Sequence, residues 1–340
     1  MAEVQISVII PAYNVEKEIT ETVYSVLNQC PEKEKIEILV VENGSTDRTV
    51  SVVEELSKND PCVHLLQSEK GVSNARNMGI LHAKGTWLVF LDADDRILPN
   101  GMSILFRDTQ ETETDIFCYG HQNGQEKKAV CDNGGIEYSS SQVELCKVEM
   151  LKNPTKYMQA WAKMIKRDLI VNNKILFNPV LRLSEDSDFI LRCIQAACNV
   201  KLKSDIIYEY VINQTSAMRS FDGNKIADYI TAMHETKKSI EGESEEVKRA
   251  FDVYVLMHMN IAMVRENFCF NNPLSLKKKY KNMKKILETE IFQEAIRSTK
   301  FGNCLSFRMA PILCTKLHMK WGAALIYYIR AKQNHLRENK

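Results

Sequence analysis

The amino-acid sequence predicts an α/β fold, in which a mainly parallel sheet is flanked by helices and followed by an all-helical C-terminal region. Short apolar runs alternate with helical patterns through the first hundred residues. These runs are apolar enough to be buried on both faces, as strands are in a parallel sheet covered by helices. From Asp222 onward, nearly every segment has the apolar period of a helix.

Each strand of the first half is predicted from an apolar or β-branched run that ends at a turn residue. Each helix is predicted from an apolar stripe with three- and four-residue spacing. The expected strands are 4–10, 36–41, 63–66 and 86–91. The expected helices are 15–29, a stripe over 49–56, and about 72–83. This alternation of strands and helices favours parallel pairing.

The pattern is looser after Asp95. Segments 115–119 and 206–211 are expected to be strands, and 120–135 a hairpin or loop. Helical character is found at 139–151, 157–165 and 187–198. We expect a domain boundary near residue 222. The first domain is then 1–221, with halves 1–98 and 99–221, and 222–340 is a helical, basic region.

Length and composition exclude several classes of protein. With 340 residues, 44% of them hydrophobic, the chain is long enough for about two domains with a sizeable core, which excludes disorder and fibrous repeats. No apolar stretch reaches the roughly 18 residues of a membrane span, and the N-terminus lacks a secretory signal pattern. We therefore expect a cytoplasmic protein whose ten cysteines, with no C-x-x-C pair, are small reduced core residues.

The net charge of +1 hides a strong asymmetry. Residues 273–340 carry 15 Lys and Arg against 4 Asp and Glu, a net charge of +11, so residues 1–272 carry −10. A basic tail on an acidic body indicates an anionic surface or partner. The lysines between 277 and 285 would suit nucleic acid or a solvated helix face, but no groove-reading motif accompanies them, so we expect no nucleic acid partner.

Three polar clusters follow the predicted strands, at the sheet edge where parallel sheets bind their ligands. They are Pro11-Ala12-Tyr13-Asn14, Glu42-Asn43-Gly44-Ser45 and Asp92-Ala93-Asp94-Asp95. Carboxylates so close together repel one another unless a hard cation balances them, so Asp92 and Asp94 predict a magnesium or manganese site with a diphosphate ligand. The alternative is that Asp94 or Asp95 only caps a helix beginning near Pro99.

Arg76 is the candidate contact for a diphosphate or nucleoside. It stands in the segment 71–79, which opens a helix whose N-terminal N–H groups favour anions. A guanidinium can bond phosphate through two parallel hydrogen bonds. The alternative is an ordinary solvated helix residue.

Four ordered motifs resemble the family 2 inverting glycosyltransferases of the GT-A fold, the nucleotide-diphospho-sugar transferases, of the type that builds bacterial surface or capsular polysaccharide. The motifs are ISVIIPAYNVEKEI, EILVVENGSTDRT, GVSNARNMGILHAKGTWLVFLDADD and LSEDSDF. They cover roughly residues 4–220 and leave the tail beyond 222 unmatched. Four motifs in order are far more specific than any one of them. The resemblance implies a Rossmann-like sheet in residues 1–221.

The resemblance also implies roles for single residues. Pro11, Ala12, Tyr13 and Glu16 would line the uridine pocket, and Arg76 would lie near the nucleotide. Asp92, Ala93 and Asp94 match the D-x-D signature that holds the nucleotide-sugar. Asp94 would be the direct ligand of Mn²⁺ or Mg²⁺, and Asp92 would contact the ribose or donor sugar near the metal.

Asn43 departs from the family pattern, which has aspartate where this chain has Glu42-Asn43. The second of the two aspartates receives the uracil imide N–H. An asparagine oxygen can still accept that hydrogen bond, and its NH₂ can donate to uracil O4. Uracil recognition is therefore preserved on chemical grounds.

The catalytic pair expected from the resemblance is Glu185-Asp186. In the family's E-D motif, the Asp removes the proton of the acceptor hydroxyl while that oxygen attacks the anomeric carbon. A general base must lie within hydrogen-bond reach, about 3 Å, of that proton. The alternative role for Asp186 is the N-cap of the helix expected at 187–198.

Two weaker features fit the same site. Trp161 and Lys163 resemble the family's aromatic-x-K element beneath the acceptor, although a tryptophan on an apolar stripe is more often core. The segment from Tyr208-Glu209-Tyr210 to Ser216-Ala217-Met218 resembles the strand and loop that close over the donor and exclude water.

The resemblance, together with these residues, implies an inverting, metal-dependent transferase. The donor would be a UDP-sugar carrying galactose, glucose or an N-acetylhexosamine, and the acceptor a glycan such as a polyprenyl-diphosphate-linked oligosaccharide. Two alternatives are a non-catalytic scaffold that binds nucleotide-sugar and a basic RNA-binding protein. Copurified RNA and a steep salt dependence would favour the latter.

The tail contains two apolar stripes at helical spacing. The first is Leu305, Met309, Ile312 and Leu313, and the second is Trp321, Leu325, Tyr328 and Ile329. Lys316, Lys320, Arg330 and Lys332 lie among them. An apolar face with Trp and Tyr beside basic residues is typical of a helix in the headgroup plane of an anionic membrane. The alternative is packing onto the catalytic domain or a second subunit, so an oligomer through these helices stays open.

Overall fold

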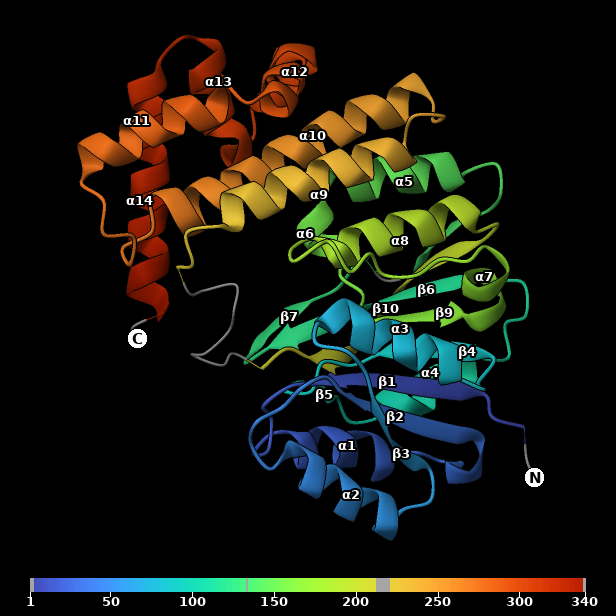
Figure 1. The fold of residues 1–340 in the computed structure, drawn as a ribbon. Coiled ribbons are helices and arrows are strands. Elements are labelled where there is room, and N and C mark those ends of the chain that lie inside the picture. Colours follow the sequence, from blue (N-terminus) through green and yellow to red (C-terminus); the bar gives the residue numbers. More distant parts are fainter. Residues whose placement is uncertain (1–2, 133, 212–220, 339–340) are drawn as a thin grey trace. The chain divides into compact units, whose positions relative to one another are not determined.

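The computed structural model describes residues 3–132, 134–211 and 221–338, which form two compact units (Figure 1). The sheet unit comprises Met1–Lys147, Thr155–Val180 and Glu185–Ile212. The helical unit comprises Val148–Pro154, Leu181–Ser184 and Asn213–Lys340. The predicted loop residues Ser216, Ala217 and Met218 lie outside the described residues.

The sheet unit is built on a mixed sheet in the order β3-β2-β1-β4-β9-β6-β10-β5, with β7 beside β6 and β8 beside β10. Its strands are β1 Ile6–Ala12, β2 Ile36–Glu42, β3 Val63–Gln67, β4 Trp87–Phe90, β5 Arg96–Ile97, β6 Ile116–Asn123, β7 Glu126–Lys128, β8 Ile136–Tyr138, β9 Lys163–Lys166 and β10 Val200–Glu209. The strands β1 to β4 pair in parallel, which confirms the alternation expected from the first hundred residues.

Helices cover this sheet. They are α1 Ile19–Leu27, α2 Thr49–Asn59, α3 Val72–His82, α4 Gly101–Asp108, α7 Arg167–Asn172 and α8 Glu185–Ala196, with a short turn η1 at Lys33–Lys35. The helices α5, Val143–Lys152, and α6, Pro154–Tyr157, each contain residues of both units. The predicted helices of the first half are therefore confirmed, with ends that differ by a few residues.

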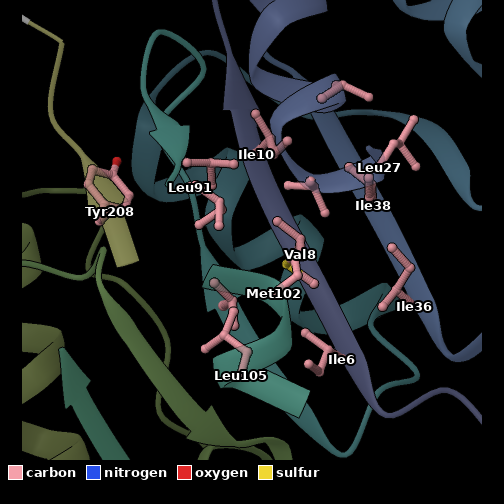
Figure 2. Packing of buried hydrophobic residues seen from close by; sticks show 14 of the residues in the cluster. Ile6, Val8, Ile10, Leu27, Ile36, Ile38, Leu91, Met102, Leu105 and Tyr208 are labelled. Carbon is pink, nitrogen blue, oxygen red and sulfur yellow. The ribbon is translucent and has the colours of Figure 1, made fainter. Parts of the chain in front are cut away.

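The central strand β1 is buried on both faces. Ile6, Val8 and Ile10 pack in one apolar cluster with Leu27 of α1 and Ile38 of β2 (Figure 2). On the other face, α3 approaches so closely that a Cβ at Gly79 would lie 2.4 Å from a methyl carbon of Ile9. Because both faces of β1 are buried, its sequence is mostly apolar and does not alternate between apolar and polar residues.

The second half of the sheet corrects two expectations. The segment 157–165 is not a helix, because its end belongs to β9, which pairs antiparallel with both β4 and β6. A short apolar run fits the period of a helix and that of a strand equally well. Here, pairing with the two neighbouring strands β4 and β6 makes the segment a strand. The sheet is also less parallel than predicted, since β5, β7 and β8 are antiparallel to their partners as well.

The helical unit confirms the prediction of an all-helical C-terminal region. Its elements are α9 Lys225–Ser239, α10 Glu245–Ala262, a π-helical turn η2 at Met263–Asn267, α11 Leu276–Leu287, α12 Glu290–Ser298, η3 Phe301–Cys304, η4 Phe307–Met309, α13 Ala310–Lys316 and α14 Lys320–Glu338. Within the described residues, every helix is too short or too polar to cross a membrane.

Candidate active site

The loops that follow β1 and β2 are tied together at one edge of the sheet. The backbone N–H of Asn14 donates to Ser45 Oγ at 3.1 Å, and the N–H of Thr46 donates to Asn14 Oδ1 at 2.8 Å. The N–H of Asn43 donates to the carbonyl of Ala12 at 3.2 Å. Two of the predicted polar clusters therefore form one surface.

The predicted uridine residues of the first loop differ in exposure. Pro11 and Ala12 are the last residues of β1 and are buried, rather than part of the following turn. Tyr13 is exposed, with Lys70 Nζ 5.0 Å from its ring centroid. Glu16 accepts from the backbone N–H of Arg48 at 2.9 Å and from its Nε at 3.2 Å, and these bonds lower the pKa of Glu16.

Asn43 offers a buried amide oxygen to this site. The residue is 4% exposed, and its Oδ1 has no hydrogen-bond partner among the described residues. The neighbouring Glu42 has a structural task, because its Oε1 accepts from the N–H groups of Gly44, at 2.6 Å, and Ser45. An unpaired buried acceptor is costly unless a ligand completes it.

The turn after β4 carries the aspartate cluster. The hydroxyl of Thr22 in α1 donates to the carbonyl of Ala93 at 2.7 Å, which fixes the turn against α1. Asp92 and Asp94 are partly exposed, whereas Asp95 is buried. Asp95 accepts from the Tyr208 hydroxyl at 2.6 Å and from the Val211 N–H at 2.8 Å, so it fastens the end of β10 to this turn.

Arg76 lies at the centre of the carboxylates. Its side chain is 4% exposed, and its guanidinium contacts Asp92 at 3.0 Å, Glu185 at 3.3 Å and Asp186 at 2.5 Å. Burial lowers the pKa of Arg76, but the three carboxylates raise it further, so the net direction is upward. Arg76 thus joins the turn after β4 to the start of α8, and its place as a nucleotide contact stays a prediction.

Glu185 and Asp186 are the first two residues of α8, rather than residues that precede it. Asp186 Oδ1 accepts from Arg76, and its Oδ2 accepts from the backbone N–H of Ala160 at 3.0 Å. Each carboxylate oxygen has two lone pairs, so each retains one after these bonds. Asp186 is therefore oriented from both sides and can still accept a proton.

Burial and repulsion by nearby aspartates raise the pKa of two carboxyls of the site. Burial, followed by the charge of Asp186, raises the pKa of Glu185 to about 7, although Arg76 opposes the shift. Burial, followed by the charge of Asp92, raises the pKa of Asp95 to about 8. The site therefore holds more negative charge than its surroundings easily bear near neutral pH.

Glu185→Gln is expected to stabilise the metal-free protein at about pH 8 and to change its stability little at about pH 4.5. A carboxyl whose pKa rises on folding holds its proton more tightly in the folded state, so wild-type stability falls as the pH rises from the usual value of 4.5 to about 7. An amide escapes this loss, which amounts to about 3 kcal/mol. Urea unfolding in EDTA measures it, and an equal change at both pH values would contradict the titration argument.

The two predicted acceptor residues lie in different surroundings. Trp161 is half-buried and stacks on Tyr208, with ring centroids 4.6 Å apart, while His121 meets its edge at 4.8 Å. Lys163 is buried in β9, and its Nζ donates to the carbonyl of Gln159 at 2.6 Å. Burial lowers the pKa of Lys163.

Sequence reasoning missed residues that hold the site together. The Asn77 side chain donates to the Phe177 carbonyl and accepts from its N–H, both at 2.8 Å, which ties α3 to a distant loop. The Phe177 ring lies 5.1 Å from the guanidinium carbon of Arg76. Tyr208 was expected only as part of a closing strand. No pattern of spacing in the sequence indicates these contacts.

The carboxylate oxygens of the cluster around Arg76 are the kind of ligand that a hard divalent cation prefers. The guanidinium of Arg76 contacts three carboxylates, so this cluster carries more negative than positive charge. Asp94 adds one more carboxylate, two residues after Asp92 in the sequence. Among the described residues, no group of three or more His, Cys, Asp or Glu is arranged to hold a metal ion. One or two carboxylates suffice where a diphosphate supplies the remaining ligands, so Asp92 and Asp94 fit such an ion.

Comparison with known proteins relates the first half of this chain to a family of enzymes. Residues 7–170 match the model of Glycosyl transferase family 2. The chain is 28% identical over 305 residues to the uncharacterized glycosyltransferase EpsJ of Bacillus subtilis (strain 168), covering 87% of each protein. It is 26% identical over 247 residues to the poly(ribitol-phosphate) beta-N-acetylglucosaminyltransferase TarP of Staphylococcus aureus (strain N315), covering 69% of this chain and 72% of TarP.

The fold is shared with a solved structure. Residues 1–349 of S. aureus TarS, in complex with UDP-GlcNAc, match with a TM-score of 0.69 at 20% identity, covering 98% of this chain and 92% of that one. At this identity, the likeness shows the fold alone. It confirms the GT-A architecture expected from the four motifs.

Proposed function

The chain carries a glycosyl transferase family 2 domain and is a glycosyltransferase, and from this premise we propose that it transfers one sugar from a UDP-sugar to a glycan with inversion. The sugar is proposed to be galactose, glucose or an N-acetylhexosamine. The observation that carries the proposal is Arg76, which brings Asp92 of the D-x-D turn and Asp186 of α8 to one guanidinium. Donor-side and acceptor-side carboxylates thus share one site.

Recognition of UDP is supported by Asn43. Its buried, unpaired Oδ1 lies in the loop after β2, next to the surface formed with the loop after β1. The uracil imide N–H would give this oxygen the hydrogen bond that it lacks, and the Asn43 NH₂ can donate to uracil O4. A relative and a structural neighbour also support this donor class, since TarP is named an N-acetylglucosaminyltransferase and TarS was solved with UDP-GlcNAc.

The chemical step assigned to Asp186 is general-base catalysis. The carboxylate takes the proton of the acceptor hydroxyl as that oxygen forms a bond to the anomeric carbon. The bond from that carbon to the diphosphate oxygen breaks with its electron pair, so UDP leaves as an anion and the configuration inverts. Arg76 and the Ala160 N–H hold Asp186 in one orientation for this transfer.

Asp92 and Asp94 are the residues proposed to hold Mn²⁺ or Mg²⁺. Such an ion would balance the charge on the diphosphate leaving group. The proposed acceptor is a glycan of a bacterial surface polysaccharide, carried on a polyprenyl diphosphate. The poly(ribitol-phosphate) in the name of TarP supports a cell-surface polymer as the acceptor class.

A panel of UDP-sugars, assayed for UDP release with Mn²⁺ and with EDTA, tests the function and identifies the donor. We expect slow metal-dependent release from one sugar of the panel, and faster release with a glycan acceptor. Tight UDP binding without release from any sugar, with or without acceptor, would instead favour the non-catalytic scaffold.

A further inference from the structure

Helix α14 presents two different faces. Ala323, Tyr327 and Ala331, spaced four residues apart, are buried. Trp321, Leu325 and Ile329 have the same spacing on the opposite side and are 70%, 60% and 45% exposed. Three large apolar side chains in one exposed row are unusual for a helix that already buries its other face.

The two apolar stripes of the tail therefore differ. In the first stripe, Met309 and Ile312 are buried, so packing within the helical unit explains it except at the exposed Leu305. In the second stripe, Tyr328 is half-buried and stacks on Phe270, with ring centroids 5.9 Å apart, while the other three residues are exposed. Packing within the helical unit leaves the rest of the second stripe open.

A lysine-rich helix continues this open stripe. Tyr280 of α11 stacks on Trp321 of α14, with ring centroids 3.8 Å apart and planes inclined by 8°. The Nζ of Lys284 lies 5.3 Å from the centroid of Tyr280, and Lys277, one turn earlier on the same face, is exposed. We define the basic-apolar face as the lysines and aromatic or apolar residues joined by this stack: Lys277, Tyr280, Lys284, Trp321, Leu325 and Ile329.

We propose that the basic-apolar face docks the enzyme on the surface of an anionic lipid bilayer. Apolar side chains with a tryptophan, placed beside lysines, match the boundary between acyl chains and charged headgroups. Each lysine near such a surface gains attraction to anionic lipid, and its stem remains apolar. The proposal goes beyond the transfer reaction, because docking needs neither donor nor acceptor.

Charge argues against a second copy of the chain on this face. Residues 300–337 contain seven Lys and Arg and no Asp or Glu. The basic-apolar face itself carries Lys277 and Lys284, so a two-fold dimer that placed the face against itself would bring these like charges together. An anionic bilayer offers the opposite charge over an area large enough for both helices.

Vesicle flotation of the full-length protein tests the proposal. We expect strong binding to phosphatidylcholine vesicles that contain about 30% phosphatidylglycerol, and weak binding to pure phosphatidylcholine. High salt should weaken the binding, since it screens the lysines. Equal binding to both kinds of vesicle, or to neither, would overturn the proposal.

Variants separate the two parts of the face. Leu325→Asp should lower vesicle binding about tenfold or more. The double variant Lys277→Ala/Lys284→Ala should lower it about 25-fold, at about fivefold for each lysine. The matched control is Leu145→Asp, which alters an exposed leucine of the sheet unit and should bind as wild type does. Leu325→Ser replaces Leu325→Asp if the latter melts at a lower temperature.

Activity and self-association complete the test. The variants should keep wild-type UDP release in solution, so a failure of docking is distinguishable from a failure of the transferase assignment. If vesicles bind every variant as they bind wild type, the face is not the docking site. If wild type is instead a dimer that Leu325→Asp makes monomeric, without vesicle binding, a second copy occupies the face and the proposal is wrong.

Discussion

Asp186→Asn is expected to slow sugar transfer by about 10²-fold or more while UDP-sugar affinity stays nearly unchanged. The amide has the shape of the carboxylate but cannot take up the acceptor proton. Its single oxygen can accept from either Arg76 or the Ala160 N–H, which both bond the carboxylate now. Initial rates with donor and acceptor measure the first effect, and calorimetry with UDP-sugar measures the second.

Glu185→Gln is the matched control for that variant. Glu185 lies in the same helical turn and also bonds Arg76, at 3.3 Å, so its amide variant removes a carboxylate from the same guanidinium. It should retain most of the transfer rate. If Glu185→Gln were inactive and Asp186→Asn kept its turnover, the general base would be Glu185 and the present assignment would be wrong.

Asp94→Asn is expected to weaken Mn²⁺-dependent UDP binding by about 10²-fold, since Asp94 is the proposed direct metal ligand and its loss should cost at least as much as altering an outer-shell residue. A neutral amide oxygen is a poorer ligand than a carboxylate where diphosphate charge must be balanced. Calorimetric titration of UDP in the presence of Mn²⁺ measures the affinity.

The same titration in EDTA supplies the control for Asp94→Asn. Without metal, wild type and variant should bind UDP with the same weak affinity, because the substitution then removes no ligand in use. Unchanged affinity in Mn²⁺ would take Asp94 out of the metal site. Equal losses in Mn²⁺ and EDTA would show that the variant disturbs the nucleotide pocket itself.

The sequence predicted the first half of the fold well because its pattern is strongly local. The strands β1, β2 and β4 are mostly apolar runs that are fully buried, and the helices α1 and α2 each have an apolar stripe of their own. The polar clusters after β1, β2 and β4 were predicted from the same alternation, since parallel strands place their carboxyl ends at one sheet edge. Burial on both faces leaves little ambiguity in such runs.

The arrangement of the charged centre required the tertiary structure. Arg76 is separated from Glu185 and Asp186 by 109 and 110 positions, and no local period relates them. The same holds for Asp95 and Tyr208, 113 positions apart. Sequence motifs therefore predicted which carboxylates carry chemistry, but only the fold showed that one buried guanidinium contacts three of these acidic side chains.

The sequence by itself determined the family motifs, the parallel strands β1 to β4, and the helical period of the tail. Tertiary structure alone decided that 163–166 forms a strand, because two buried neighbours supply its hydrogen bonds. Tertiary structure also decided which of the two apolar stripes of the tail is buried, because the two stripes have the same helical period and a similar composition. Met309 is buried and Leu325 meets solvent, since α14 turns a different row of side chains inward, where the Tyr327 hydroxyl donates to Asn260 of α10. Helical spacing records which residues share a face, whereas the packing of other helices determines which face is covered.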